Sequence, residues 1–260
     1  GGIQLSVQPT KDVLVIVLPN GLTSRTSQTT FTHLLPGQYH VKIEVSDHLT
    51  TNLTIAVQPN VTTVIDPLYL WPDQVLLPST TQTQPASASE TTDLPIVFQS
   101  ILAQHNLSDS TDYYLVSQRQ MIVLDPATRI VMEYTRDGSV ITSQQLGSAI
   151  TQMALAQNKL LLVSEFSLAV VDLSINTTET ITRLSTPILQ ATWLMNTPYI
   201  AYATSHDLHI IDTRKQTNYL DQIVATTPQE INKLWFDTEH NDLQLTLGTK
   251  TYRWPLELSK

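Results

Sequence analysis

The chain has 260 residues, a net charge of −9 at pH 7, and a composition that is 41% hydrophobic and 14% charged. This length allows one large core or two ordinary ones, and the lack of any basic cluster argues against nucleic acid or an anionic membrane surface as partner. The absence of cysteine excludes disulfides, thiolate metal sites and cysteine nucleophiles. Thr, Gln, Ser and Asn carry the polarity in place of Lys and Glu, which favours strands.

The first seventy residues alternate short strands with turns. An apolar run at 13–18 stops at Pro19-Asn20-Gly21, a strong turn signal. Residues 38–45 alternate apolar and polar side chains with the period of a half-buried strand, and residues 61–70 supply a last strand. Short strands at this spacing predict a small β-sandwich over residues 1–71.

Two motifs of this part coincide with those of a known module. Pro19-Asn20-Gly21-Leu22 stands at the first turn, and residues 34–43 read Leu-Leu-Pro-Gly-Gln-Tyr-His-Val-Lys-Ile around a second turn. With these motifs, residues 11–70 resemble the PEGA domain, a small β-sandwich of bacterial surface and envelope proteins. The chain departs from that family at Ser46-Asp47-His48-Leu49, where Gly-Tyr often follows the hairpin. The resemblance implies an extracytoplasmic location in the bacterial cell envelope.

Residues 72–94 change in character and are rich in Pro, Ser, Thr and Gln. Such a stretch cannot bury a core, so we expect a flexible linker. About 15–20 flexible residues reach roughly 20–25 Å. The parts before and after the linker are therefore expected to move relative to one another.

From residue 95 onward a strand pattern repeats. Equivalent positions Asp125, Asp172, Asp212 and Trp254 follow one another after 47, 40 and 42 residues, which is close to the length of a four-stranded propeller blade. Residues 95–260 are thus predicted to form a β-propeller-like repeat domain of about four blades. From the second copy onward each is preceded by a further strand, expected at 150–155, 188–194 and 231–236.

The repeat pattern indicates about four blades, and two arrangements of these blades are compatible with it. We expect residues 96–102 to supply a strand that the first or last blade lacks, so that four blades close into a ring. The alternative is an open fragment, which exposes a sheet edge and can pair with another copy.

Two polar motifs suggest metal sites, but each has a simpler interpretation. His206 and His209 lie three residues apart, and such positions point to opposite faces of a strand, so a solvated turn followed by a strand residue is favoured over a shared ion. Residues 237–242 form an acidic stretch that lacks the spacing and glycine of a calcium loop, so a hairpin turn is favoured there.

The repeated aspartates and the aromatic residues are the remaining candidates. Asp125, Asp172 and Asp212 could line a channel and hold a cation, but Asp at a strand end more often accepts backbone N–H bonds from the next turn. Exposed aromatic side chains could stack on sugars or peptides. Trp193 and Trp235 occupy comparable places in consecutive copies, which indicates core between blades. The aromatic candidates are Tyr69, Trp71, Trp193, Trp235 and Trp254.

No catalytic, cofactor-binding or metal-ligating residue is predicted, although a triad of distant residues stays open. The sequence favours a non-catalytic extracytoplasmic binding or scaffolding protein of the bacterial cell envelope, with a protein or a cell-wall glycan as partner. We expect a membrane anchor encoded upstream of Gly1. The alternatives are a glycan-active hydrolase with a carboxylate pair in the propeller channel and a self-associating surface-layer component.

Overall fold

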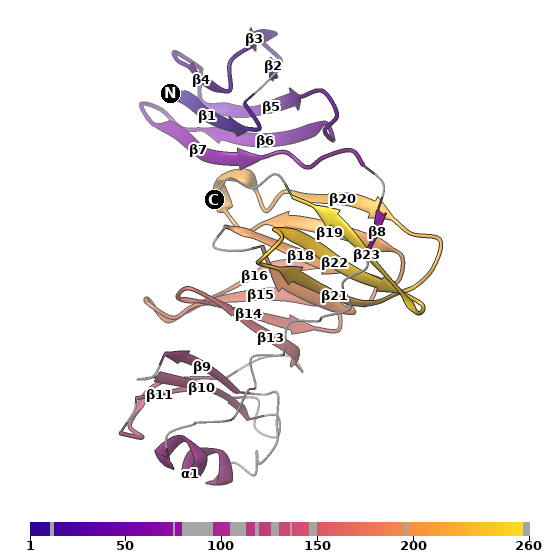
Figure 1. Ribbon diagram of the computed structural model, residues 1–260. Coiled ribbons are helices and arrows are strands. Elements are labelled where there is room, and N and C mark those ends of the chain that lie inside the picture. Colours follow the sequence, from indigo (N-terminus) through magenta and orange to yellow (C-terminus); the bar gives the residue numbers. More distant parts are fainter. Residues whose placement is uncertain are drawn as a thin grey trace.

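The computed structural model describes residues 1–10, 13–74, 76–79, 96–104, 113–117, 120–125, 130–135, 137–145, 150–194 and 197–256 (Figure 1). In this part the chain is all-β apart from one α-helix and one short 3-10 helix, and it forms one three-stranded and five four-stranded sheets. Two sheets make an N-terminal sandwich, and four follow as a row of propeller-like blades. The expectation of an all-β chain with four-stranded repeats is confirmed.

The sandwich is built from the first seven strands. In one sheet β1 lies between β4 and β7, antiparallel to β4 and parallel to β7, and the other sheet has the order β3-β2-β5-β6. Both sheets share one apolar core. The strands are β1 (Gly2–Gln8), β2 (Leu14–Leu18), β3 (Leu22–Ser24), β4 (Gln28–Phe31), β5 (Gly37–Glu44), β6 (Thr51–Val57) and β7 (Thr62–Tyr69).

The alternation predicted for residues 38–45 is observed in β5. Tyr39, Val41 and Ile43 are buried in the sandwich core, whereas His40 is exposed. The predicted turn after β2 contains Gly21 at a φ of +64°, a left-handed conformation that a side chain disfavours. Strand period and turn chemistry therefore agree in this part of the chain.

The four blades follow one another along the chain. Blades one, two and three have four consecutive strands each, and β13, β17 and β21 are the strands expected ahead of each later copy. Blade one is β9 (Tyr113–Ser117), β10 (Gln120–Asp125), β11 (Ile130–Thr135) and β12 (Val140–Gln145); blade two is β13 (Ile150–Ala156), β14 (Lys159–Ser164), β15 (Ser167–Asp172) and β16 (Thr177–Arg183); blade three is β17 (Gln190–Trp193), β18 (Tyr199–Ala203), β19 (Asp207–Asp212) and β20 (Asp221–Thr226); blade four contains β21 (Ile231–Asp237), β22 (Asp242–Leu247) and β23 (Lys250–Pro255).

The segment expected to be a strand at 96–102 is a helix instead. Helix α1 (Ile96–Gln104) packs Phe98, Ile101 and Leu102 against Met121 of blade one and its neighbours. The buried positions follow the spacing of one helix face, i, i+3 and i+4, whereas a short apolar run by itself does not separate helix from strand. None of the described helices has the length and hydropathy that a membrane span requires.

The fourth strand of blade four comes from before the blades. Strand β8 (Leu77–Pro78) pairs with β23 through Tyr252 and Arg253, and the Ser79 N–H donates to the Thr251 carbonyl at 2.9 Å. This differs from the expected linker at 72–94, because Pro72 pairs with His48 of the sandwich and residues 77–79 pair with β23 of blade four. Residues 80–94 of the expected linker lie outside the described residues.

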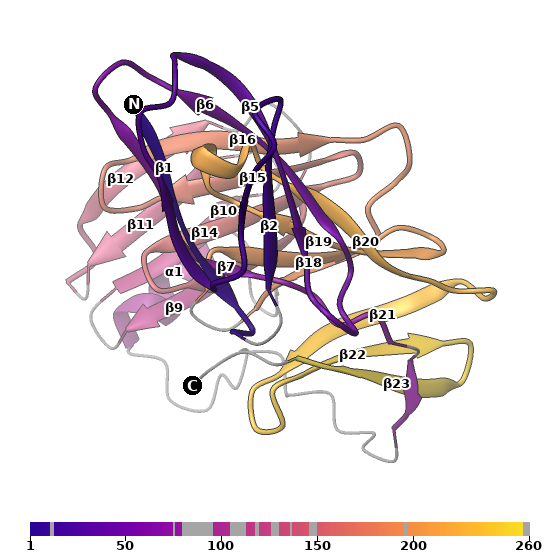
Figure 2. The same ribbon diagram turned by 90° about the horizontal axis from the view of Figure 1, so that it is seen from above.

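The blades form an open row among the described residues. Contacts join blade one to two, two to three and three to four, and no comparable contact joins the described elements of blades four and one. In Figures 1 and 2 these two blades lie at opposite ends of the row. Closure into a ring was therefore the wrong expectation for this part of the chain, and the open alternative describes it.

Glutamine side chains tie neighbouring blades together at equivalent positions. The Gln152 side chain donates to the Ala191 carbonyl at 2.8 Å and accepts from the Ala191 N–H at 3.0 Å. The side-chain carbonyl of Gln190 accepts the Leu234 N–H at 2.6 Å. Each glutamine thus bonds the inner strand of the next blade. Lys233 holds the equivalent position in blade four, which aligns the three inner strands residue by residue.

An aromatic junction joins the sandwich to blades three and four. Tyr69 and Trp71, at the exit of β7, pack on Tyr199 with ring centroids 5.7 and 5.0 Å away, and Trp71 also contacts Trp254. Trp71 is 3% exposed, so it is core and not an exposed stacking platform. Leu220 of blade three packs against the sandwich core. The two parts therefore share a packed interface, which differs from two bodies joined only by a flexible linker.

Candidate binding surfaces

A cleft of about 480 Å³ lies between blades three and four. Val224 and Leu247, both 6% exposed, give it an apolar floor. The Thr227 hydroxyl lies 3.0 and 2.7 Å from the carbonyl oxygens of His206 and Gln229, which fixes the rim. The lining residues are Asp73, Gln74, Leu76, Val224, Ala225, Thr226, Thr227, Pro228, Gln229, Leu247 and Tyr252.

The lining of this cleft is apolar or neutral apart from one carboxylate, that of Asp73. Glycoside hydrolysis by the common route needs two carboxyl groups about 5–9.5 Å apart. The described lining offers one such group, with Thr and Gln side chains that donate and accept hydrogen bonds. These groups suit binding by shape and hydrogen bonds.

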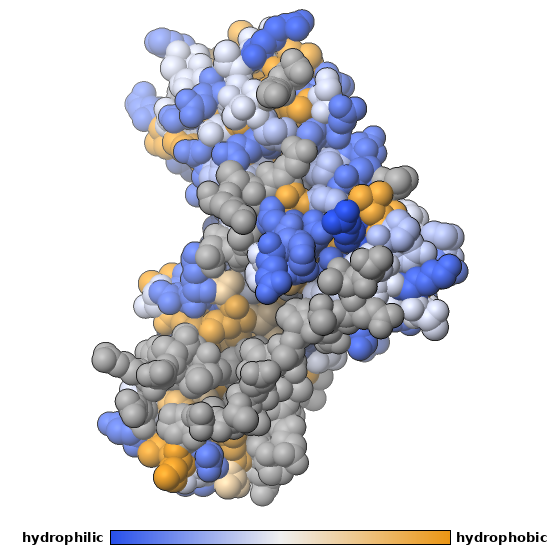
Figure 3. All heavy atoms as spheres, viewed as in Figure 1, coloured by the Kyte–Doolittle hydropathy of each residue, from blue (hydrophilic) through white to orange (hydrophobic). Residues whose placement is uncertain are grey.

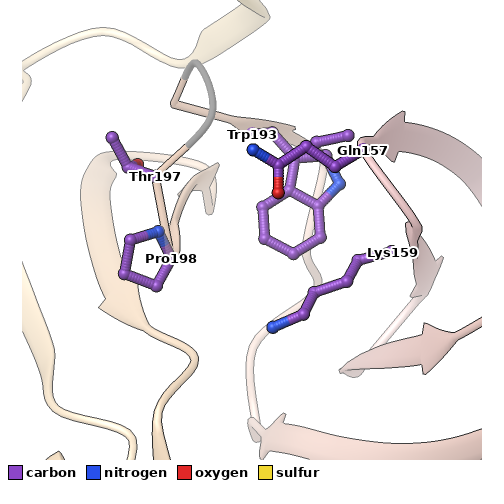
Figure 4. A pocket seen from close by; sticks show the side chains of 6 residues that line it. Gln157, Lys159, Trp193, Thr197 and Pro198 are labelled. Carbon is purple, nitrogen blue, oxygen red and sulfur yellow. The ribbon is translucent and has the colours of Figure 1, made fainter. Parts of the chain in front are cut away.

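A smaller cleft of about 190 Å³ opens between blades two and three (Figure 4). Trp193, Gln157 and Lys159 line one side, and Thr197 and Pro198 face them across the gap. The Trp193 Nε1–H donates to the Ala154 carbonyl at 3.1 Å, so the indole is held by the inner strand of blade two. The cleft therefore combines a fixed aromatic wall with a single positive charge.

The two histidines of the 206–209 motif lie in different elements. His206 is exposed in a turn, whereas His209 lies in β19 and stacks on Tyr202 at a centroid distance of 4.5 Å. The His209 Nδ1 is 3.2 Å from Asp221 and 3.0 Å from the Tyr202 hydroxyl. Burial, and then the hydrogen bond to Asp221, raise the pKa of Tyr202. The described residues hold no group of three metal-ligating side chains.

The strand-end aspartates hold turns. The Asp172 carboxylate accepts the Ser174 N–H at 3.0 Å, and that of Asp212 accepts the Arg214 N–H at 2.9 Å. The acidic stretch at 237–242 behaves alike, since Asp237 accepts the Glu239 N–H at 3.0 Å. Hydrogen bonds from Ser174 lower the pKa of Asp172. The side chain of Asp125 lies outside the described residues.

One buried ion pair had no signal in the sequence. The Asp212 side chain is fully buried, and the Arg214 guanidinium binds it at 2.7 and 2.9 Å and donates to the Tyr199 hydroxyl at 2.8 Å. The Tyr69 N–H also donates to that hydroxyl, at 3.0 Å. Burial, and then the Asp212 charge, raise the pKa of Tyr199. The pair therefore holds the sandwich exit on blade three.

Trp193 and Trp235 are not equivalent, in contrast to the expectation. Trp193 lies three residues after Gln190 and packs towards blade two, whereas Trp235 lies two residues after Lys233, between Leu234 and Phe236, which both pack towards blade three. A shift of one residue in a strand reverses the face. Trp235 thus points away from blade three, and its half-buried side chain is not core between blades.

Comparisons with known proteins give only distant structural similarity. No family model matches the chain, and no curated protein matches it. Solved structures similar to it include the mitotic checkpoint complex (10% identity, TM-score 0.42), the dihydro-heme d1 dehydrogenase NirN in complex with DHE (10%, 0.47) and the N-terminal domain of Nup159 (11%, 0.39). These similarities cover 54%, 55% and 55% of this chain. The chain spans 47%, 33% and 43% of those chains, which is less than half of each.

Proposed function

We propose that this chain is a non-catalytic binding and scaffolding protein of the bacterial cell envelope that acts outside the cytoplasm. The observation that carries the binding role is the cleft between blades three and four, with its apolar floor and a lining that is neutral apart from Asp73. The cell-envelope location rests on the resemblance of residues 11–70 to the PEGA domain.

The ligand of the cleft is an extended protein segment. Strand β20, which lines the cleft, is the outermost strand of its sheet, and an extended peptide can add to such an edge while its side chains enter neighbouring pockets. Val224 and Leu247 offer an apolar surface for one side chain, and Gln74 and Gln229 offer amide groups for the peptide backbone. The aromatic junction supports scaffolding, because it holds the sandwich in a defined place beside the cleft.

Peptide selection tests the binding role. Random peptides displayed on phage are selected on the whole chain, and affinities are compared for the wild type and for Ala225→Trp, which fills the cleft. Thr182→Trp is the matched control, because Thr182 in blade two holds the same register position as Ala225 in blade three. We expect Ala225→Trp to weaken the selected peptides about tenfold or more and Thr182→Trp to leave them unchanged. Equal affinity in both variants, or no selected peptide, would contradict the proposal.

Fractionation tests the location. The natural gene product is expressed with an epitope tag, and cells are separated into cytosolic and envelope fractions, with external protease applied to intact cells. We expect the tag in the envelope fraction. We also expect the external protease to cleave the chain on intact cells. Recovery in the cytosolic fraction alone would overturn the cell-envelope assignment and leave the cleft unaffected.

A further inference from the structure

One row of residues can be followed across the blades on the face towards the next blade. Its first member lies two residues after the inter-blade position held by Gln152, Gln190 and Lys233, and the strand registers give the other two members. The row is Ala154, Leu161 and Val170 in blade two; Thr192, Ala201 and Ile210 in blade three; and Trp235, Gln244 and Arg253 in blade four.

In blades two and three this row packs against the next blade. Leu161 and Val170 belong to the core between blades two and three, and Ala201 and Ile210 belong to the core between blades three and four. Four of the six side chains in these two rows are apolar and at most 7% exposed. Sheet-on-sheet packing thus requires small or aliphatic side chains in this row.

Blade four has an aromatic, an amide and a guanidinium in the same places. Gln244 is 2% exposed, and its Oε1 has no hydrogen-bond partner. The Nε1–H of Trp235, its cross-strand neighbour, is also buried without a partner. The two groups do not bond one another, although one is a donor and the other an acceptor. Leaving a buried polar atom without a partner destabilises the folded chain, so such a pair marks a place where a ligand can supply the missing hydrogen bonds.

The rest of the row adds an ion pair at the rim. The Arg253 Nη1 lies 3.5 Å from Asp242 Oδ2, with side-chain exposures of 46% and 6%. Leu77 of β8 is the cross-strand neighbour of Arg253 and is 37% exposed. The row thus runs from a half-buried indole through a buried amide to an exposed guanidinium paired with a carboxylate.

We propose that the outer face of blade four binds a saccharide along the Trp235–Gln244–Arg253 row. A hydroxyl group both donates and accepts, so one sugar hydroxyl can donate to the Gln244 carbonyl and accept from the Trp235 indole. The indole face offers an apolar surface to the C–H groups of the sugar ring, and the Arg253–Asp242 pair offers donors and acceptors for neighbouring hydroxyls. An apolar partner would leave the amide unpaired, so a further blade or a second copy fits this row poorly.

Titration calorimetry on the whole chain tests this proposal, with the trimers of N-acetylglucosamine and of glucose as separate probes. We expect saturable binding of at least one trimer. Gln244→Leu removes the acceptor at similar volume, and Trp235→Phe removes the N–H but keeps a ring; each is expected to weaken binding about tenfold or more. Ala225→Trp is the control, because it blocks the cleft between blades three and four and leaves this row untouched.

The outcomes separate this site from the peptide cleft. Binding that is lost in Gln244→Leu and kept in Ala225→Trp supports the proposal whether or not any peptide binds the cleft. No saturable binding of either trimer to the wild type would overturn the proposal. Binding that survives both row variants would overturn it as well.

Discussion

In the described part of the chain, the first and last blades of the row each have one sheet face that no neighbouring blade covers, and the two faces differ in chemistry. At one end α1 covers blade one with Phe98, Ile101 and Leu102. At the other end blade four presents Trp235, Gln244 and Arg253 on the face away from blade three. A terminal sheet face needs either an apolar cover or a polar surface of its own. Blade one is thus covered by apolar packing, whereas blade four keeps buried polar groups without hydrogen-bond partners.

The capped end is not fully polar on its outside. Hydrophobic residues are visible where α1 and blade one lie (Figure 3), and Ile96 is 80% exposed. Val140 and Ile141 of β12 are also exposed, at 52% and 48%. The helix therefore buries one face of blade one and adds some exposed apolar surface of its own.

The largest effect is expected at the capped end. Phe98→Ala removes a fully buried ring from the contact between α1 and blade one and is expected to lower the free energy of unfolding by about 3–5 kcal/mol. Urea denaturation followed by circular dichroism measures it. Ile96→Ala on the exposed side of the same helix is the control, with an expected change within about 0.5 kcal/mol. Equal effects in the two variants would show that α1 does not cap the blade.

Two glutamine substitutions compare a side-chain amide that has hydrogen-bond partners with one whose carbonyl has none. Gln152→Leu leaves the N–H and carbonyl of Ala191 without their partner, and is expected to lower the free energy of unfolding by about 1–3 kcal/mol. Gln244→Leu removes an acceptor that has no partner, and is expected to leave that free energy unchanged or raise it by about 1 kcal/mol. The same denaturation curves measure both variants. A loss in Gln244→Leu as large as in Gln152→Leu would remove the distinction between the ends.

Acidification is expected to act on a buried carboxyl of blade one. Glu133 is 6% exposed, and burial raises its pKa above the ordinary value of 4.5. Because the folded state then binds the proton more tightly than the unfolded state, the free energy of unfolding falls as pH rises from 4.5 through the raised pKa. Glu133→Gln is expected to be more stable than the wild type at pH 7, with a difference that shrinks towards pH 4. Urea denaturation at both pH values measures it, and a constant difference would contradict it.

The smallest effect is expected in the turn of blade four, with the opposite sign. Partial burial opposes ionisation of Asp237, but hydrogen bonds from the His240 ring and from the backbone of Glu239 and His240 outweigh it and lower its pKa below 3.8. Its contribution to stability is therefore complete above pH 3.8 and is lost as pH falls through the lowered pKa. Asp237→Asn is expected to remove that part of the acid sensitivity. Thermal unfolding between pH 2 and pH 5 tests it, and an unchanged pH profile would contradict it.

Much of the fold follows from strand period and turn chemistry. The alternation in β5 and the strands β13, β17 and β21 were predictable because each has a periodic face and a turn at its end. Helix α1 was not predictable, because the seven residues 96–102 fit both the helical and the strand period. Strand β8 has two residues, too few for any pattern to show.

The candidate sites were less predictable, since they depend on register and distance. Trp193 and Trp235 look equivalent by spacing, and one residue of slip places them on opposite faces. Arg214 and Asp212 are two residues apart and read as an ordinary turn, although the structure buries them against Tyr199. Gln244 resembles any polar strand residue until its burial is known.

The most direct test of the contrast between the two ends is the response of the four indole N–H signals to a saccharide. The signals are assigned by single Trp→Phe variants and followed by proton–nitrogen correlation spectra during titration with the N-acetylglucosamine and glucose trimers. We predict that the Trp235 signal moves with saturation, while those of Trp71, Trp193 and Trp254 stay in place because they are buried in cores or bonded to the backbone. Four unchanged signals, or a shift confined to the other three, would contradict the assignment of blade four as the binding end.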